Sequence, residues 1–274
     1  MPWTLQSHTA SDGYRWQYRH YAASGAARAD VICLHGIQSH AGWYELSCEA
    51  LAQAGYDVCF LDRRGSGTNS EARGDVSGFR RLLDDIAEFL RPRRPEKRIV
   101  LLAISWGGKL AAALQRRHPG LFDAMALLCP GFCPAVGLSL RERLSVFAAR
   151  LVTPGRLFDI PLSDAELFTA TPKALEFIRR DPLALRKATA RLLVESVRLD
   201  SYLRWFPPRI TGPVLLMLAG RDRIIDNALT RALVKRITTG KLEVVEYPNA
   251  HHTLEFEPDR EFIADMITWL ARVI

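Results

Sequence analysis

Residues 2–24 alternate between polar and apolar positions, most clearly in the run Tyr14-Arg15-Trp16-Gln17-Tyr18. A period of two is typical of a strand that buries one of its faces. Asp12-Gly13 separates two such runs, and this dipeptide favours a tight turn between antiparallel strands. The pattern therefore predicts a hairpin at the edge of a sheet.

After the hairpin, the pattern changes to short, continuous apolar runs separated by segments of helical length. The runs cover residues 29–35, 56–62, 98–104, 125–130, 213–219 and 242–247. Apolar residues at spacings of three and four predict helices over 44–54, 76–90, 108–118 and 259–273, and Pro92, Pro95 and Pro119 end the second and third of these. This alternation implies crossover connections and a mostly parallel central sheet with helices on both faces, an α/β fold.

Residues 134–209 contain no comparable strand run. Their helical patterns are interrupted at Pro154, Pro161, Pro172, Pro182 and Pro207. We therefore expect a helical cap at 134–209, inserted between two parts of an α/β core at 1–133 and 210–274. The insertion holds 13 Lys or Arg and 8 Asp or Glu, so its net charge of +5 accounts for most of the +7 of the 274-residue chain.

Composition narrows the class of protein. The chain is 48% hydrophobic and 24% charged, the balance of a folded globular protein. Its start lacks the basic and apolar regions of a secretory signal, and no run is long enough to span a bilayer, so we expect a cytoplasmic protein that is at most peripheral to a membrane. Lys and Arg are scattered without a basic-aromatic motif, which argues against nucleic acid as a partner.

The five cysteines form an odd set without the spacing of a metal site. Most of them lie in apolar runs, and we interpret them as small core residues in a reducing compartment. Cys129 and Cys133 have an alternative interpretation as a redox pair, although their spacing is C-x-x-x-C.

The apolar run 98–104 leads directly into Ala103-Ile104-Ser105-Trp106-Gly107-Gly108. A serine nucleophile on a sharp strand-to-helix turn needs small residues two positions before and two positions after it. Ala103 and Gly107 meet this need, although Ala103 replaces the first glycine of the usual G-x-S-x-G motif. Ser105 is therefore the candidate nucleophile, and its alternative is a serine in an ordinary turn.

A serine nucleophile requires a base and a carboxylate that orients the base. Asp222 follows the apolar run 213–219, where a strand end would expose it beside Ser105, whereas Asp226 lies where a helix begins and is better suited to capping. His251 and His252 follow the last strand run on a loop. We take Asp222 as the carboxylate and one of these two histidines as the base, and the family resemblance given below contributes to the choice of His252 over His251.

Two backbone N–H groups are needed to stabilise an oxyanion. Trp106 follows the nucleophile, and Ile37 follows Gly36 at the end of the first apolar run, where glycine allows a close backbone approach. His35 is interpreted as structural. A metal site built from His35, His40, His251 and His252 lacks carboxylate partners and helical spacing, so neither a metal nor another cofactor is expected.

The chain resembles the monoacylglycerol lipase and lysophospholipase branch of the α/β-hydrolase superfamily, which is similar to the serine aminopeptidase S33 group. The resemblance covers nearly the whole length and is carried by residues 34–44, 61–70, 103–108, 220–226 and 249–254. It implies a triad of Ser105, Asp222 and His252, oxyanion donors at Ile37 and Trp106, and a helical cap. Where the family usually has Gly-His-Gly, this chain has Gly65-Ser66-Gly67.

The resulting hypothesis is hydrolysis of carboxylic esters through an acyl-enzyme, with small-molecule acyl esters, lipids among them, as the candidate substrates. Gly36 lies at the expected site, and apolar cap residues are candidates for an acyl pocket, with ordinary core packing as their alternative: Leu138, Leu144, Phe147, Leu151, Leu157 and Phe158. The basic cap suggests an anionic substrate or membrane surface, unless it is simply a solvated face. Acyl transfer, thioester cleavage and C–C bond hydrolysis would use the same triad, and a non-catalytic binding protein is the alternative of another class.

Overall fold

A computed structural model describes residues 3–274 of the chain. Its centre is an eight-stranded sheet with the order β1-β2-β4-β3-β5-β6-β9-β10. β1 (Thr4–Thr9) and β2 (Arg15–Tyr21) form the predicted antiparallel hairpin, in which Thr4 faces His20 and Thr9 faces Arg15. β1 is the exposed edge strand, and the apolar positions of β2 face the core.

The remaining strands of this sheet run parallel to one another: β3 (Asp30–Leu34), β4 (Asp57–Leu61), β5 (Ile99–Ile104), β6 (Ala124–Leu128), β9 (Val214–Ala219) and β10 (Leu242–Tyr247). β3, β5, β6 and β9 are buried at every position, which explains their continuous apolar sequences. Leu34, Ala103 and Leu127 lie in register across β3, β5 and β6. The carboxyl ends of these strands therefore form one edge, as in other open α/β sheets that bind ligands there.

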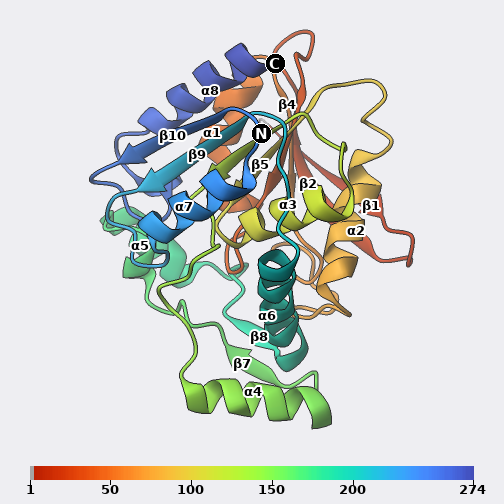
Figure 1. Cartoon of the computed structure of the whole chain (residues 1–274), viewed down its shortest axis with the longest axis vertical. Helices are drawn as coiled ribbons and strands as arrows, with labels where there is room; N and C mark the ends of the chain where they lie inside the picture. The colour runs from red at the N-terminus through yellow and green to blue at the C-terminus, as the bar shows by residue number, and fades with distance from the viewer. Residues whose placement is uncertain (1–2) are drawn as a thin grey trace.

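Helices cover both faces of the sheet (Figure 1). α1 (Glu45–Gln53) packs beside α8 (Glu261–Val273) on one face, while α2 (Phe79–Leu90), α3 (Trp106–Arg117) and α7 (Asn227–Ile237) lie on the other. α8 buries Phe262, Met266 and Trp269, whose spacing is that of one helical face. α7 is not among the helices predicted above. Among residues 3–274, no helix combines the length and the apolar content that a membrane span requires.

The chain leaves the sheet after β6 and returns to it at β9. We call residues 134–209, the predicted insertion, the cap. It contains α4 (Leu140–Val152), α5 (Pro172–Arg180) and α6 (Ala190–Trp205), and also two short strands, β7 (Leu157–Asp159) and β8 (Lys187–Thr189). β7 and β8 pair antiparallel, and this short ribbon was not predicted from the sequence. Strands of three residues are too short to show an alternating pattern.

α6 lies between the core and the outer part of the cap, and α4 forms the far end of the molecule (Figure 1). Three polar contacts fasten α6 to the core: Glu195 accepts the Phe79 N–H at 3.1 Å, Ser196 accepts the Trp106 indole N–H at 2.9 Å, and Asp200 pairs with Lys109 at 2.6 Å. α4 packs on α6 and buries only Val146 and Ala149. The inner part of the cap is thus tied to the core, whereas α4 is attached through α6.

Candidate active site

Ser105 lies on the turn between β5 and α3, with φ 51° and ψ −121°. This left-handed region is strained for a residue with a side chain and is typical of a nucleophile on a sharp turn. Gly107 explains why a small residue is required there, since a Cβ at this position would lie 2.4 Å from the Leu34 carbonyl oxygen. Ala103 is fully buried in β5, so the alanine fits where the usual motif has glycine.

His252 and Asp222 lie in a chain of hydrogen bonds with Ser105. Nε2 of His252 is 2.9 Å from the Ser105 Oγ, and its Nδ1 is 2.7 Å from the Asp222 Oδ2. The second Asp222 oxygen accepts the N–H groups of Ile224 at 2.8 Å and Ile225 at 3.1 Å. An ionised carboxylate can only accept, so Nδ1 carries the proton and Nε2 is free to accept the proton of Ser105.

The two competing residues have other partners. Asp226 caps α7 by accepting the Leu229 N–H at 2.9 Å. The backbone N–H of His251 donates to Glu257 at 3.0 Å, and Nδ1 of His251 is 3.1 Å from the same carboxylate. Both residues therefore lie outside the chain of hydrogen bonds that includes Ser105.

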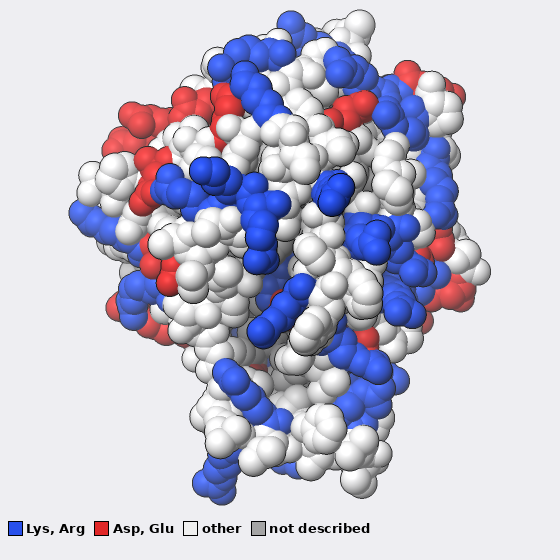
Figure 2. Space-filling model, in the orientation of Figure 1, with Lys and Arg blue, Asp and Glu red and all other residues white. Residues whose placement is uncertain are grey.

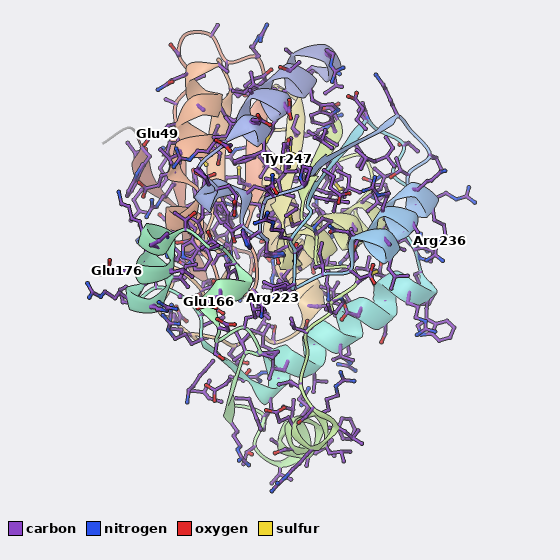
Figure 3. All side chains as sticks on the ribbon, turned by 90° about the vertical axis from the view of Figure 1, so that its left-hand side faces the viewer. Glu49, Glu166, Glu176, Arg223, Arg236 and Tyr247 are labelled. Atoms are coloured by element: carbon purple, nitrogen blue, oxygen red, sulfur yellow. The ribbon has the colours of Figure 1, made fainter. Side chains whose placement is uncertain are left out.

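The cap contacts the loops that carry His252 and Asp222. The Thr253 N–H donates to the Phe168 carbonyl at 3.0 Å, and the Phe168 ring meets the His252 ring edge-on with centroids 6.1 Å apart. On the neighbouring loop, Arg223 pairs with Asp164 at 3.9 Å, close to Glu166 in Figure 3. Sequence reasoning missed Phe168, because nothing in its local pattern distinguishes it from other apolar cap residues.

The two predicted oxyanion donors approach Ser105 from different segments. Trp106 follows Ser105 in the chain, and Ile37 lies on the loop after β3. A Cβ built on Gly36 would lie 3.2 Å from the Ser105 Cβ, so the loop after β3 passes directly beside Ser105. Trp106 is the first residue of α3, where backbone N–H groups have no partner within the helix. Within the described residues, neither the Trp106 N–H nor the Ile37 N–H is bonded to an acceptor. The amino end of α3 also favours negative charge.

His35 holds the loop after β3 rather than a ligand. Its Nε2 accepts the Arg63 N–H at 3.0 Å, and its Nδ1 is 2.6 Å from the Gly36 carbonyl oxygen. Burial, together with the nearby Arg63 charge, lowers the pKa of His35 well below its ordinary value. His35 is therefore neutral, with the proton on Nδ1, and it has a structural role as the sequence suggested.

Cys129 places a thiol near the candidate triad, with its Sγ and one ligand atom each of Asp222 and His252 within 4.8 Å of one another. This is the only group of its kind among residues 3–274. Burial raises the pKa of the Cys129 thiol well above its ordinary value, so the thiol stays protonated and is a poor metal ligand. Cys129 and Cys133 are both free, without a disulfide between them.

Comparison with known proteins places this site in a family. The sequence profile of the family described as serine aminopeptidase, S33 matches residues 25–259. The chain belongs to this family. Its relatives include the monoacylglycerol lipase of Mycolicibacterium smegmatis, 27% identical with 94% of this chain and 93% of the relative covered. Lysophospholipase L2 of Escherichia coli K12 is 26% identical, with 92% and 82% covered.

Solved structures confirm the predicted α/β-hydrolase fold of this S33-family chain. The monoacylglycerol lipase of Paleococcus ferrophilus superimposes with a TM-score of 0.84 at 20% identity, covering 100% of both chains. A soluble variant of the monoglyceride lipase of Saccharomyces cerevisiae, solved with a substrate analogue, gives a TM-score of 0.84 at 18% identity, covering 99% and 96%.

The predicted acyl-pocket residues of this S33-family member occupy two kinds of place. Leu138 and Phe158 are partly buried and pack against the hydrophobic core. Phe147 lies on α4 and is 58% exposed, and the other predicted residues Leu144, Leu151 and Leu157 are 63%, 72% and 53% exposed. Phe147 therefore lies on the outer surface of the cap rather than in an enclosed pocket, because α4 turns only Val146 and Ala149 inward.

Proposed function

We propose that the protein is a serine hydrolase of carboxylic esters, with Ser105 as nucleophile, His252 as base and Asp222 as the residue that orients the base. The observation that supports this most is the unbroken chain Ser105–His252–Asp222, with contacts of 2.9 and 2.7 Å, on a strained turn. If His252 and Asp222 were only a structural ion pair, there would be no need for a serine with a strained, left-handed backbone at the start of a helix beside them.

In the proposed reaction, the Ser105 Oγ attacks the ester carbonyl carbon while its proton moves to Nε2 of His252. The negative charge that develops on the carbonyl oxygen is stabilised by the N–H groups of Ile37 and Trp106. His252 then protonates the departing alcohol, which leaves an acyl-enzyme on Ser105. Water then attacks the acyl carbon while His252 takes its proton. His252 returns this proton to the Ser105 Oγ as the bond between Oγ and the acyl carbon breaks, which releases the carboxylic acid and regenerates Ser105.

For the substrate, we propose a lipid ester with a single acyl chain, a monoacylglycerol or a lysophospholipid. The support is the agreement among relatives: a monoacylglycerol lipase, a lysophospholipase and Phospholipase YtpA of Bacillus subtilis, the last 24% identical with 85% of this chain and 91% of the relative covered. The alternative chemistries, which are acyl transfer, thioester cleavage and C–C bond hydrolysis, have no comparable support among these relatives.

Labelling with a fluorophosphonate probe tests the nucleophile. The wild type should be labelled and should hydrolyse p-nitrophenyl butyrate, while Ser105→Ala should do neither and should keep its thermal midpoint. Asp226→Asn is a matched control that should behave as the wild type. Absence of labelling in the wild type, or equal labelling of Ser105→Ala, would contradict the proposal.

We further propose that the cap docks on an anionic lipid surface through α4. Leu140, Leu144, Phe147 and Leu151 are 74%, 63%, 58% and 72% exposed, and their spacing of four, three and four puts them on one side of the helix. Arg141, Arg143 and Arg150 flank this apolar side, with Glu142 as the one acidic residue of α4. Figure 2 shows the corresponding end of the molecule with basic side chains around uncharged ones.

An exposed apolar helix face bordered by arginines suits a membrane interface that carries negative charge. The expected acyl-pocket role of Phe147 is thus replaced by a role in docking. The same basic surface would bring the enzyme to the aggregates in which single-chain lipids accumulate.

Co-sedimentation with vesicles tests the docking. The wild type should bind phosphatidylcholine vesicles that contain phosphatidylglycerol more tightly than pure phosphatidylcholine, and high salt should weaken this binding. Leu144→Asp with Phe147→Asp should abolish binding and leave hydrolysis of the water-soluble ester intact. Leu229→Asp, an equally exposed leucine on α7, is the control. Vesicle binding that survives the double substitution would refute the assignment.

A further inference from the structure

Arg63 lies in the loop after β4 and reaches the backbone of the loop after β3. Its guanidinium donates to the Gly36 carbonyl at 3.1 Å and to the Ile37 carbonyl at 2.8 Å. The same group stacks on the indole ring of Trp106, 5.0 Å from the ring centroid. Arg63 therefore contacts both residues whose backbone N–H groups form the proposed oxyanion hole.

Arg63 has no acidic partner. Within residues 3–274, no carboxylate oxygen lies within 4.0 Å of its guanidinium nitrogens. Even the adjacent Asp62 is engaged elsewhere, because its carboxylate accepts the Ala41 N–H at 2.8 Å and both the N–H and the hydroxyl of Thr68 at 2.9 Å. Burial lowers the pKa of Arg63 to about 10, so the guanidinium still carries its charge at neutral pH.

A partly buried cation without a carboxylate is unfavourable for stability alone. Arg94, for comparison, has its guanidinium on Asp123 at 2.9 Å, whereas Arg73 resembles Arg63 and donates to the carbonyls of Gly67 at 3.0 Å and Leu183 at 2.8 Å. The Arg63 guanidinium has no carboxylate as an acceptor, and it donates instead to two backbone carbonyls of one loop, those of Gly36 and Ile37. This arrangement calls for an explanation other than ion pairing.

The geometry of the peptide bond supplies that explanation. The Gly36 C=O and the Ile37 N–H belong to one planar trans peptide, in which they point in opposite directions. Arg63 and Nδ1 of His35 both bind the Gly36 oxygen, at 3.1 and 2.6 Å. Fixing the carbonyl on one side of this peptide fixes the Ile37 N–H on the other. A cation on the carbonyl also polarises the peptide and strengthens the N–H as a donor.

We propose that Arg63 is a positioning residue of the oxyanion hole. It orients and polarises the peptide bond that carries the Ile37 N–H, and its guanidinium packs on the indole ring of Trp106, the residue that carries the second donor. The inference rests on the proposed esterase function. Arg63 acts through Gly36, Ile37 and Trp106 and touches no reacting atom. Its contribution should therefore appear in the transition state, where the oxyanion exists, and not in substrate binding.

Two substitutions and a control test this role. Arg63→Gln removes the charge and keeps at most one of the two hydrogen bonds, while Arg63→Lys keeps the charge without the planar pair of donors. Arg93→Gln is the matched control, because Arg93 also donates to a backbone carbonyl, that of Phe89 at 2.9 Å, and stacks on the Phe89 ring, away from Ser105. The readouts are kcat and KM for p-nitrophenyl butyrate and the affinity for a trifluoromethyl ketone, which forms a tetrahedral oxyanion with the serine.

We expect Arg63→Gln to lower kcat about 10- to 100-fold, somewhat less than the loss of a whole oxyanion donor, with KM unchanged. Affinity for the trifluoromethyl ketone should fall by a similar factor. Arg63→Lys should show a smaller loss of both quantities, and Arg93→Gln should show neither.

The inference is overturned if either Arg63 variant keeps wild-type affinity for the trifluoromethyl ketone, or if KM rises while kcat is unchanged. If Arg63→Gln does not fold, Arg63→Lys decides by the same two measurements. Failure of the proposed function looks different: the wild type itself would then not hydrolyse the ester or bind the ketone.

Discussion

Asp222→Asn tests the proposed triad most directly, because the surroundings of Asp222 dictate how the new amide must lie. The N–H groups of Ile224 and Ile225 both donate to Oδ1. An NH2 group placed there would face two donors, so the Asn carbonyl takes this position and the NH2 group faces His252. Nδ1 of His252 must then accept, and its proton moves to Nε2, which can no longer accept the proton of Ser105.

The expected loss follows from this change of tautomer. With the base in the wrong form, kcat should fall by about 10³- to 10⁴-fold, equivalent to about 4 to 5 kcal/mol of transition-state stabilisation. KM and the thermal midpoint should change little, because Asn has the shape of Asp and keeps both backbone hydrogen bonds.

The assay is steady-state hydrolysis of p-nitrophenyl butyrate at pH 7, with Asp226→Asn as control. Asp226 is an exposed helix cap, and Asn caps a helix as well as Asp does, so this variant should match the wild type. If Asp222→Asn kept kcat within tenfold of the wild type, or if both variants lost activity equally, the assignment of Asp222 would be wrong.

Two further predictions concern packing and pH. Gly107→Ala should disrupt the turn and lower both the thermal midpoint and kcat, because the new Cβ would lie 2.4 Å from a backbone oxygen. Gly155→Ala is the control and should be neutral, since a Cβ there meets nothing within 4 Å. Thermal melts and ester hydrolysis compare the two variants. Asp181 joins the cap to His40 at 2.9 Å and Trp43 at 2.7 Å. Burial alone would raise the pKa of Asp181, but these hydrogen bonds hold it below its ordinary value. The stabilisation that ionised Asp181 contributes is therefore present above pH about 4 and is lost as the pH falls through the lowered pKa. Asp181→Asn should lower the free energy of unfolding in urea by about 1–3 kcal/mol at neutral pH and by progressively less in acid. A difference that stays constant with pH would contradict this.

The parts of the fold that the sequence predicts are those with a local signal. The run 98–104 is continuously apolar because β5 is buried on both faces, and the small residues Ala103 and Gly107 mark the turn at its end. Asp222 and the His251-His252 pair could be chosen because each lies on the loop after a strand run, and strand ends of a parallel sheet meet at one edge. The choice of His252 over His251 rests partly on the family resemblance. Their distances to Ser105 could not be predicted.

The parts that the sequence does not predict depend on contacts between distant segments. Arg63 looks like any charged loop residue until β3 and β4 are paired and bring it to Gly36. Phe168 has the same composition signal as a core residue, and only the folded chain places it against His252. Leu144, Phe147 and Leu151 were predicted as candidates for an acyl pocket, but helical spacing does not reveal whether another element covers the side of α4 on which they lie.

The cap is best understood as two parts with different relations to the site. Its inner part is hydrogen-bonded to residues of the proposed site. Ser196 accepts the indole N–H of Trp106, and the Phe168 carbonyl accepts the N–H of Thr253, next to His252. Displacing this inner part would therefore disturb Trp106 through α6, and His252 through Phe168. Its outer part, α4, shares no hydrogen bond with Ser105, Asp222 or His252 within the described chain and exposes its apolar side. Selection for catalysis should thus act on α6, while selection for the surface on which the substrate resides should act on α4, and substitutions in the two helices should separate these effects.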